Sequence, residues 1–297
     1  MSSPDLSANA TETPYAALAD AQDDSRWAFG TGFADPLSGV DTSVPPGMAG
    51  ADLSTYCLML GDDALIFSHR LQEWCTNAPE LEDEVAIANI GLDLLGQARL
   101  LLARAGKADG SERSEDSYAF FRAENEFRNV RLAELPRGDF ARLIAALLVF
   151  STWRLALLQR LRDSRDPVLA AIADKGIKEV AYHRDYAAQW AVRLGDGTEY
   201  SHERMRVGLE DVWPYVDELF TPRPVELRVG VDPSTLRAEF DEVLAQVLSA
   251  ATLQVPGVPA RAGVSGRTGR DGVHTEAMGY LLAELQSVAR AHPDATW

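Results

Sequence analysis

The chain has 297 residues, 46% of them hydrophobic, which is enough for one large domain or two small ones. Its formal net charge of -17, from 45 acidic and 28 basic residues, repels phosphate backbones and anionic lipids, so we expect no nucleic-acid and no membrane partner. We find no run of 18 apolar residues and no signal peptide. Cys57 and Cys75 are expected about 27 Å apart along one helix, too far for a disulfide, which favours a cytoplasmic protein with reduced thiols.

Residues 1–50 are predicted to form an extended or disordered N-terminal arm, because they are rich in Ala, Ser, Asp, Pro and Gly and lack periodicity. Trp27, Phe29 and Phe33 leave two interpretations open. The arm is either a flexible tail or a segment that lies along a surface of this chain or of a partner. Residues 51–297 are predicted to form one helical domain.

The first helix is expected to begin at Asp52, a suitable N-cap, and to end near Asn77 and Pro79. The second covers Glu80–Arg104 and carries two apolar rows. One row has the steps of four and three that are typical of a helix packed on one face: Leu81, Val85, Ala88, Leu92 and Leu95. The other row is Ile87, Ile90, Leu94 and Leu101. A helix that is apolar on most sides is usually central in a bundle.

A polar stripe crosses this second helix, because Asn89, Asp93 and Gln97 are four residues apart. A buried carboxylate needs partners, since burial without them is costly. One interpretation is a solvated seam or a satisfied internal network. The other is half of a metal site between helices.

The later helices have clearer ends. A helix is expected over about residues 115–134, and the next begins at Asp139. Another has Asp166 as its cap and Pro167 in its first turn, and it ends at Gly195. A further helix is expected to be capped by Ser201 and to reach Phe220, with Pro214 as a kink. No alternating strand is found, so the prediction is an all-α domain whose four long helices form a bundle.

The C-terminal part has three features. Residues 221–230 form a loop in which VELRV is a short extended piece, and Asp232-Pro233 then begins a helix. Residues 255–272 form a glycine-arginine loop, interpreted either as a mobile surface loop or as a phosphate or acyl-CoA contact through Arg267 or Arg270. The last helix covers about residues 275–291.

A di-iron carboxylate site would need a Glu on each of two helices and Glu-x-x-His on the other two. The literal Glu199-x-x-His202 straddles a turn, so we interpret it as chance. Glu179 and His183 are four residues apart and form a looser pair. Nucleophile-elbow, Walker and dinucleotide-binding motifs are not found.

Four blocks carry a family resemblance: GDDALIFSHRLQEW, APELEDEVAIANIGLDLLGQARLLL, DPVLAAIADKGIKEVAYHRDYAAQWAVRLGDGT and GVHTEAMGYLLAELQ. They resemble the structural subunit of the bacterial ring-1,2-phenylacetyl-CoA epoxidase, from about Leu58 to Trp297. The resemblance implies a ferritin-like four-helix bundle with additional C-terminal helices. It places the metal-ligand positions of the related catalytic subunit at Phe67, Asp93, Gly96, Ser151, Val180 and His183.

Among those positions only Asp93 and His183 have side chains suited to iron, so we predict a degenerate site with no catalytic residue, no metal and no cofactor in this chain. Asp93 and His183 are then expected to pair with each other or with Arg154, the alternative being one adventitious metal ion.

The same resemblance implies partners. These are a catalytic di-iron subunit, other subunits including a reductase that passes electrons from NADPH, and phenylacetyl-CoA near the interface. Candidate CoA contacts are Glu126, Arg128, Leu227 and Arg228. Two other hypotheses stay open: a self-sufficient di-iron oxygenase or oxidase, and an unrelated helical interaction protein.

Overall fold

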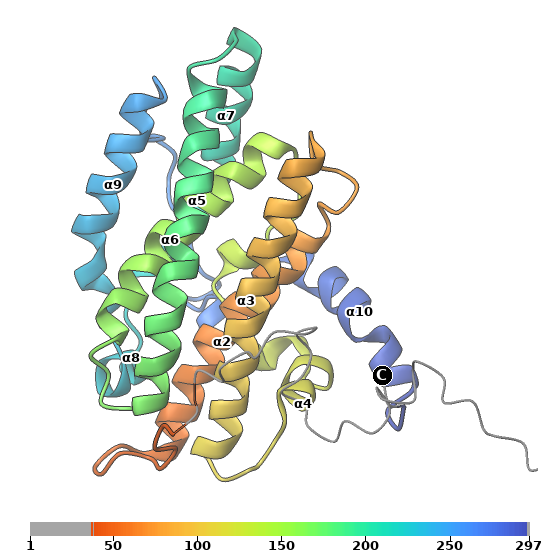
Figure 1. The fold of residues 1–297 in the computed structure, drawn as a ribbon, viewed down its shortest axis with the longest axis vertical. Coiled ribbons are helices and arrows are strands. Elements are labelled where there is room, and N and C mark those ends of the chain that lie inside the picture. Colours follow the sequence, from red (N-terminus) through yellow and green to blue (C-terminus); the bar gives the residue numbers. More distant parts are fainter. Residues whose placement is uncertain (1–36, 38, 296–297) are drawn as a thin grey trace, which may run out of the picture. The chain divides into compact units, whose positions relative to one another are not determined.

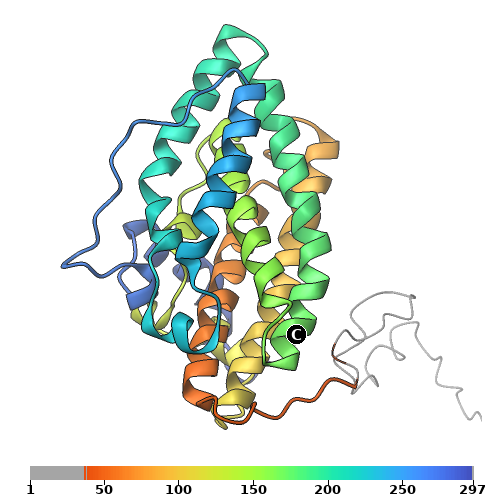
Figure 2. The same cartoon turned by 90° about the vertical axis from the view of Figure 1, so that its left-hand side faces the viewer.

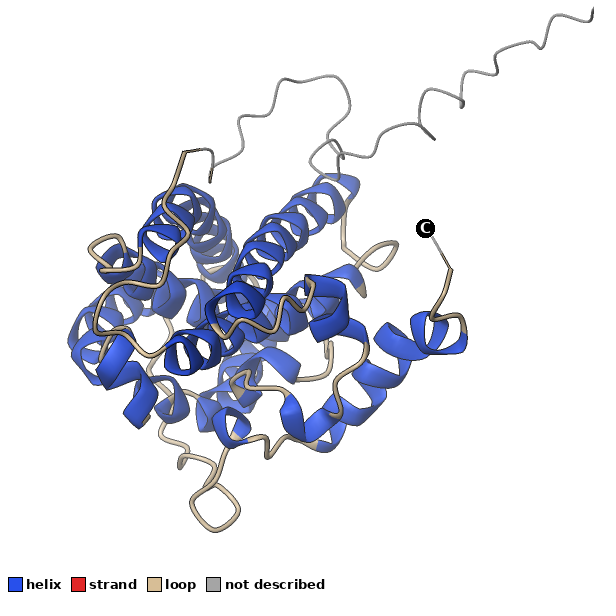
Figure 3. Cartoon of the chain, turned by 90° about the horizontal axis from the view of Figure 1, so that it is seen from below, coloured by secondary structure: helices blue, strands red, loops and turns tan. Residues whose placement is uncertain are grey.

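A computed structural model describes residue 37 and residues 39–295. Its contacts divide the chain into two units, residues 1–38 and residues 39–297. In the described part of the second unit the regular secondary structure is helical, with one isolated bridge between Val264 and Arg267 (Figure 3). The predicted all-α class is therefore confirmed. Most of the predicted N-terminal arm lies outside the described residues.

Four long helices form the core bundle: α2 (Gly50–Gln72), α3 (Leu81–Ala108), α5 (Phe140–Leu161) and α6 (Pro167–Gly195). The helices α2 and α3 pack as one antiparallel pair, α5 and α6 as another, and α3 meets α6 across the bundle (Figure 1). This is the arrangement predicted for a ferritin-like bundle. Both α3 and α5 are long and apolar enough to cross a membrane by length and composition, but 94% of the most apolar window of α5 is buried inside the fold. A buried core helix passes the same test.

The side-chain caps of α5 and α6 follow the sequence. Asp139 accepts a hydrogen bond from the backbone N of Arg142 at 2.9 Å, and Asp166 accepts one from the backbone N of Leu169 at 2.9 Å. Pro167 occupies the first turn of α6, where its missing N–H has no partner to lose. The start of α2 differs from the prediction. The helix begins at Gly50, so Asp52 lies in its first turn instead of capping it.

Shorter helices surround the bundle: α4 (Glu115–Phe120), α7 (Glu199–Val212), α8 (Pro224–Val229), α9 (Arg237–Ala250) and α10 (Glu276–Ala291). The helices α7 and α9 cover the α5–α6 side (Figure 2). On the other side, α10 packs on α4 and on the 3-10 turns Glu124–Glu126 and Arg131–Glu134. The helices α7, α9 and α10 correspond to the additional C-terminal helices that were predicted.

The prediction of a single helix over residues 115–134 was wrong. The chain leaves helical geometry after Phe120 and makes two separate 3-10 turns. The cause is tertiary. The backbone N of Arg128 donates to Asp62 of α2 at 2.8 Å, and that of Val130 donates to Asp63 at 2.8 Å. These amides bind carboxylates of α2 in place of carbonyls within a helix.

Three smaller expectations also need correction. The N-cap of α7 is Thr198, and Ser201 is the N3 residue of the capping box. The helix ends at Val212, and 3-10 turns carry the chain through Pro214 to Phe220, because proline cannot donate to a helical carbonyl. The VELRV segment is helical and belongs to α8.

The glycine-arginine loop of residues 255–272 is anchored at its end, contrary to the mobile-loop interpretation. Arg270 is buried, and its Nη2 lies 2.9 Å from Oδ2 of Asp63 in α2. Arg131 reaches the loop as well, since its guanidinium donates to the carbonyl oxygen of Arg261 at 3.0 Å. Arg270 is therefore not available to a ligand phosphate.

The two apolar rows of α3 have opposite environments. The row Ile87, Ile90, Leu94 and Leu101 is buried against the bundle. The other row, which we call the outer row, is Leu81, Val85, Ala88, Leu92 and Leu95. Its first, second and fourth members are 72%, 53% and 43% exposed, and the other two are partly buried. The prediction that the outer row is the packed face was therefore wrong.

Candidate functional site

The six positions implied by the resemblance lie on the four bundle helices, one or two on each: Phe67, Asp93, Gly96, Ser151, Val180 and His183. Two of them fill space or bond locally. The ring of Phe67 packs on that of Phe150 with centroids 4.4 Å apart, and Ser151 Oγ donates to the carbonyl oxygen of Leu147 at 2.6 Å. Val180 is fully buried and apolar. These three side chains cannot hold a metal ion.

Asp93 and His183 meet between α3 and α6. His183 Nε2 lies 3.0 Å from Asp93 Oδ2, the imidazole is 1% exposed, and the carboxylate side chain is 38% exposed. The pair therefore spans from the surface to the interior. Gly96, one turn further along α3, adds nothing to it, since a Cβ at that position would meet no atom within 4 Å.

A second polar group lies one turn deeper in the same seam. Gln97 Oε1 accepts from Arg154 Nε at 2.9 Å, and Gln97 Nε2 donates to Glu179 Oε2 at 2.9 Å. Lys175 approaches the other oxygen of Glu179 at 3.5 Å. Asp93 and Gln97 of the polar stripe are thus hydrogen-bonded between helices, which fits the internal-network interpretation, while Asn89 of the same stripe is exposed.

A buried cation, the guanidinium of Arg154, dominates the electrostatics of this network. Arg154 is 1% exposed, and burial lowers its pKa to about 10, so the guanidinium stays charged at neutral pH. Burial also raises the pKa of Glu179, an effect that Gln97 and Lys175 oppose. A fixed guanidinium inside the bundle repels a second cation, because charges interact strongly where water is excluded.

A di-iron pair does not fit these residues. Ligation of two irons takes a carboxylate from each helix and two histidines, and the bundle interior has one aspartate–histidine pair. Among residues 39–295 no group of three or more His, Cys, Asp and Glu side chains is arranged to hold a metal ion.

A second buried cluster, which was not predicted from the sequence, is formed by adjacent aspartates of α2. Asp62 and Asp63 are both fully buried. Asp62 forms an ion pair with Arg122, whose Nη1 lies 3.0 Å from Oδ2, and Asp63 pairs with Arg270. Burial raises the pKa of Asp63, and the nearby guanidinium of Arg270 opposes that rise. The sequence feature that could have revealed this cluster is the GDDA segment, which places two charges within an apolar helix.

The two arginines among the candidate CoA contacts bind aspartates of α2 at two separate places. Arg128 donates through Nη1 to the carbonyl oxygen of Asn125 at 2.8 Å, and its backbone is held by Asp62. Arg228 pairs with Asp52 at 2.7 Å. These aspartates are ten residues apart on one helix, which is about 15 Å.

The other two CoA candidates differ in their environments. Glu126 accepts from the backbone N of Ala123 at 2.7 Å, and Leu227 is 57% exposed. Together the four candidates belong to two separate segments, and both arginines already have acceptors within the chain.

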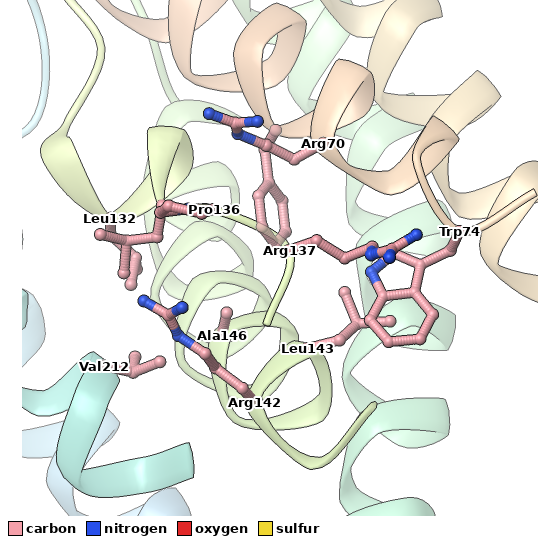
Figure 4. A pocket seen from close by; sticks show the side chains of 11 residues that line it. Arg70, Trp74, Leu132, Pro136, Arg137, Arg142, Leu143, Ala146 and Val212 are labelled. Carbon is pink, nitrogen blue, oxygen red and sulfur yellow. The ribbon is translucent and has the colours of Figure 1, made fainter. Parts of the chain in front are cut away.

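A small pocket lies beside Phe67, where α2 ends and α5 begins (Figure 4). Its volume is about 20 Å³, which holds about one water molecule. The guanidinium of Arg137 lies over the Trp74 ring at 5.6 Å, and Trp74 Nε1 is buried with no acceptor among the described residues. The pocket is too small for an organic substrate.

Comparison with known proteins gives two matches. A family model described as phenylacetic acid catabolic protein matches residues 40–297. One subunit of the 1,2-phenylacetyl-CoA epoxidase of Escherichia coli (strain K12) is 44% identical over 251 residues. That alignment covers 82% of this chain and 99% of the relative.

Proposed function

The chain belongs to the phenylacetic acid catabolic protein family, and from that premise we propose that it is the non-catalytic structural subunit of a phenylacetyl-CoA epoxidase. In this role it pairs with a catalytic di-iron subunit, stabilises it, and contributes to the acyl-CoA site near their interface. The likeness to an epoxidase subunit over nearly the whole length of that relative supports the assignment.

The observation that carries the proposal is the content of the bundle interior. Phe67 and Ser151 occupy the positions at which the resemblance implies carboxylates in the catalytic subunit, and Arg154 brings a positive charge into the bundle interior. A bundle of this composition keeps its fold through packing and internal hydrogen bonds. We infer that its contribution to a reaction comes through its surface.

The chemistry of the complex belongs to other chains under this proposal. The partner subunit holds the di-iron centre, and a reductase supplies electrons from NADPH. Phenylacetyl-CoA binds at or near the contact between the two bundles, and the complex works in the cytoplasm.

Elemental analysis tests this division of labour. The full chain purified alone is expected to contain no stoichiometric iron, and the chain coexpressed with its companion oxygenase subunit to copurify with about two irons per pair, all held by that companion. Stoichiometric iron in the lone chain would overturn the proposal and favour a self-sufficient di-iron oxygenase. Failure of the two chains to copurify would favour an unrelated helical interaction protein.

A further inference from the structure

The outer row of α3 has the residue spacing of a helix–helix seam, but no helix within residues 39–295 covers it. Its steps are four, three, four and three, which are the a and d positions of a heptad repeat. A heptad row packs its side chains into the holes of a facing helix. Three of its five side chains are exposed within the fold, up to 72% for Leu81. The missing element is therefore an α-helix.

The surface beside the row allows a close approach. Gly96 faces open space, because a Cβ there would meet no atom within 4 Å. A groove of about 340 Å³ begins at Leu92 and Leu95 and continues between α2 and α4, where Leu65 and Phe120 line it. Such a groove accepts a bulky apolar side chain, the usual anchor of a protein interface.

The charges beside the row determine what kind of helix fits. Glu82 and Glu84 flank the row, whereas Asp83 and Asp93 bond to side chains of α6. A second copy of this chain packed in parallel would bring these glutamates of the two chains together. A matching helix instead carries basic residues beside its apolar row, since flanking charges decide which helices pair.

We propose that the outer row of α3 is the docking surface for an amphipathic, basic-flanked helix of the catalytic subunit. This inference rests on the proposed function and names the face that pairs. The Leu92–Leu95 groove takes the anchoring side chain, and Glu82 and Glu84 meet the basic flank. Exposure of the row in the single chain then has a physical reason, because the complex buries it.

A matched pair of substitutions tests the surface. Val85 in the outer row and Val255 in a distant loop are 53% and 52% exposed, so Val85→Glu and Val255→Glu make the same change at equal exposure. Each full-length variant is coexpressed with the companion subunit, and affinity is measured by surface plasmon resonance. Thermal unfolding of each variant alone shows whether it is folded.

We expect Val85→Glu to weaken pairing by about tenfold or more and Val255→Glu to change it by less than about twofold, with both variants unfolding as the wild type does. Added salt should weaken wild-type pairing, because the contact joins opposite charges. Equal affinities of the two variants for the companion subunit would refute the outer row as the docking surface while leaving the proposed function intact. A wild-type chain that does not pair would instead refute the proposed function. A dimer of the lone chain that Val85→Glu dissociates would assign the row to self-association and overturn the proposal.

Discussion

Asp93→Ala is expected to cost stability, because the carboxylate is the acceptor for a buried imidazole. Removing it leaves Nε2 of His183, a side chain only 1% exposed, without its partner at 3.0 Å. Stranding one buried polar group costs about 1–3 kcal/mol. The lower half of that range is expected, because Asp93 lies at the edge of the seam and water can enter the space it leaves. At about 2–4 °C per kcal/mol, the midpoint of thermal unfolding should fall by roughly 2–8 °C.

The assay is thermal and urea unfolding of the full chain, followed by far-ultraviolet circular dichroism. Asp93→Asn keeps an oxygen acceptor and should lose less than Asp93→Ala. Asp185→Ala on α6 is the control, since Asp185 is exposed and surface changes are usually within about 0.5 kcal/mol. A double-mutant cycle with His183→Ala should give a coupling energy of at least about 0.5 kcal/mol.

Two results would refute this reasoning. If Asp93→Ala unfolds as the wild type does, the carboxylate is not needed to satisfy the buried imidazole. If the single changes add without coupling, the two side chains act independently. Loss of bound iron in Asp93→Ala, at unchanged stability, would show that the pair is a metal site.

Two other predictions follow from the buried polar groups. Gln97→Leu removes the acceptor of the buried Nε of Arg154 and should destabilise the chain by about 2–3 kcal/mol, more than Arg154→Met, which removes the charge itself. Chemical denaturation compares the two, and the reverse order would contradict the network. Burial lowers the pKa of His274, but the hydrogen bond and charge of Glu134 outweigh it, so the folded pKa lies above 6.5. The stabilisation is then complete below about pH 6.5 and is lost as pH rises through the folded pKa. The advantage of wild type over His274→Gln should shrink from about pH 6 to about pH 9, and a constant difference would exclude this linkage.

Local signals predicted the bundle well where they were strong. The aspartate caps at Asp139 and Asp166, with Pro167 after the second, mark helix starts by hydrogen bonds and backbone geometry that involve only a few neighbouring residues. Four long periodic segments then suffice to predict four packed helices. The resemblance added the ferritin-like arrangement and the six positions to inspect.

Prediction failed where a distant residue decided the local structure. Residues 121–134 have a helical composition, yet Asp62 and Asp63 bind their backbone amides and break the helix into turns. The loop of residues 255–272 looked mobile, yet Arg270 is anchored in the core. No local pattern reports a contact between residues that are more than 60 positions apart in the chain.

The sequence by itself determined the four long helices, the apolar rows of α3, and the residue types at the six positions that the resemblance implies. These depend on periodicity, caps and side-chain chemistry, all of which are local. Only the tertiary structure decided which row of α3 is buried, since both rows have helical spacing and burial depends on what packs opposite. It also decided that Asp93 meets His183 while Gln97 meets Arg154, because these pairs join separate helices.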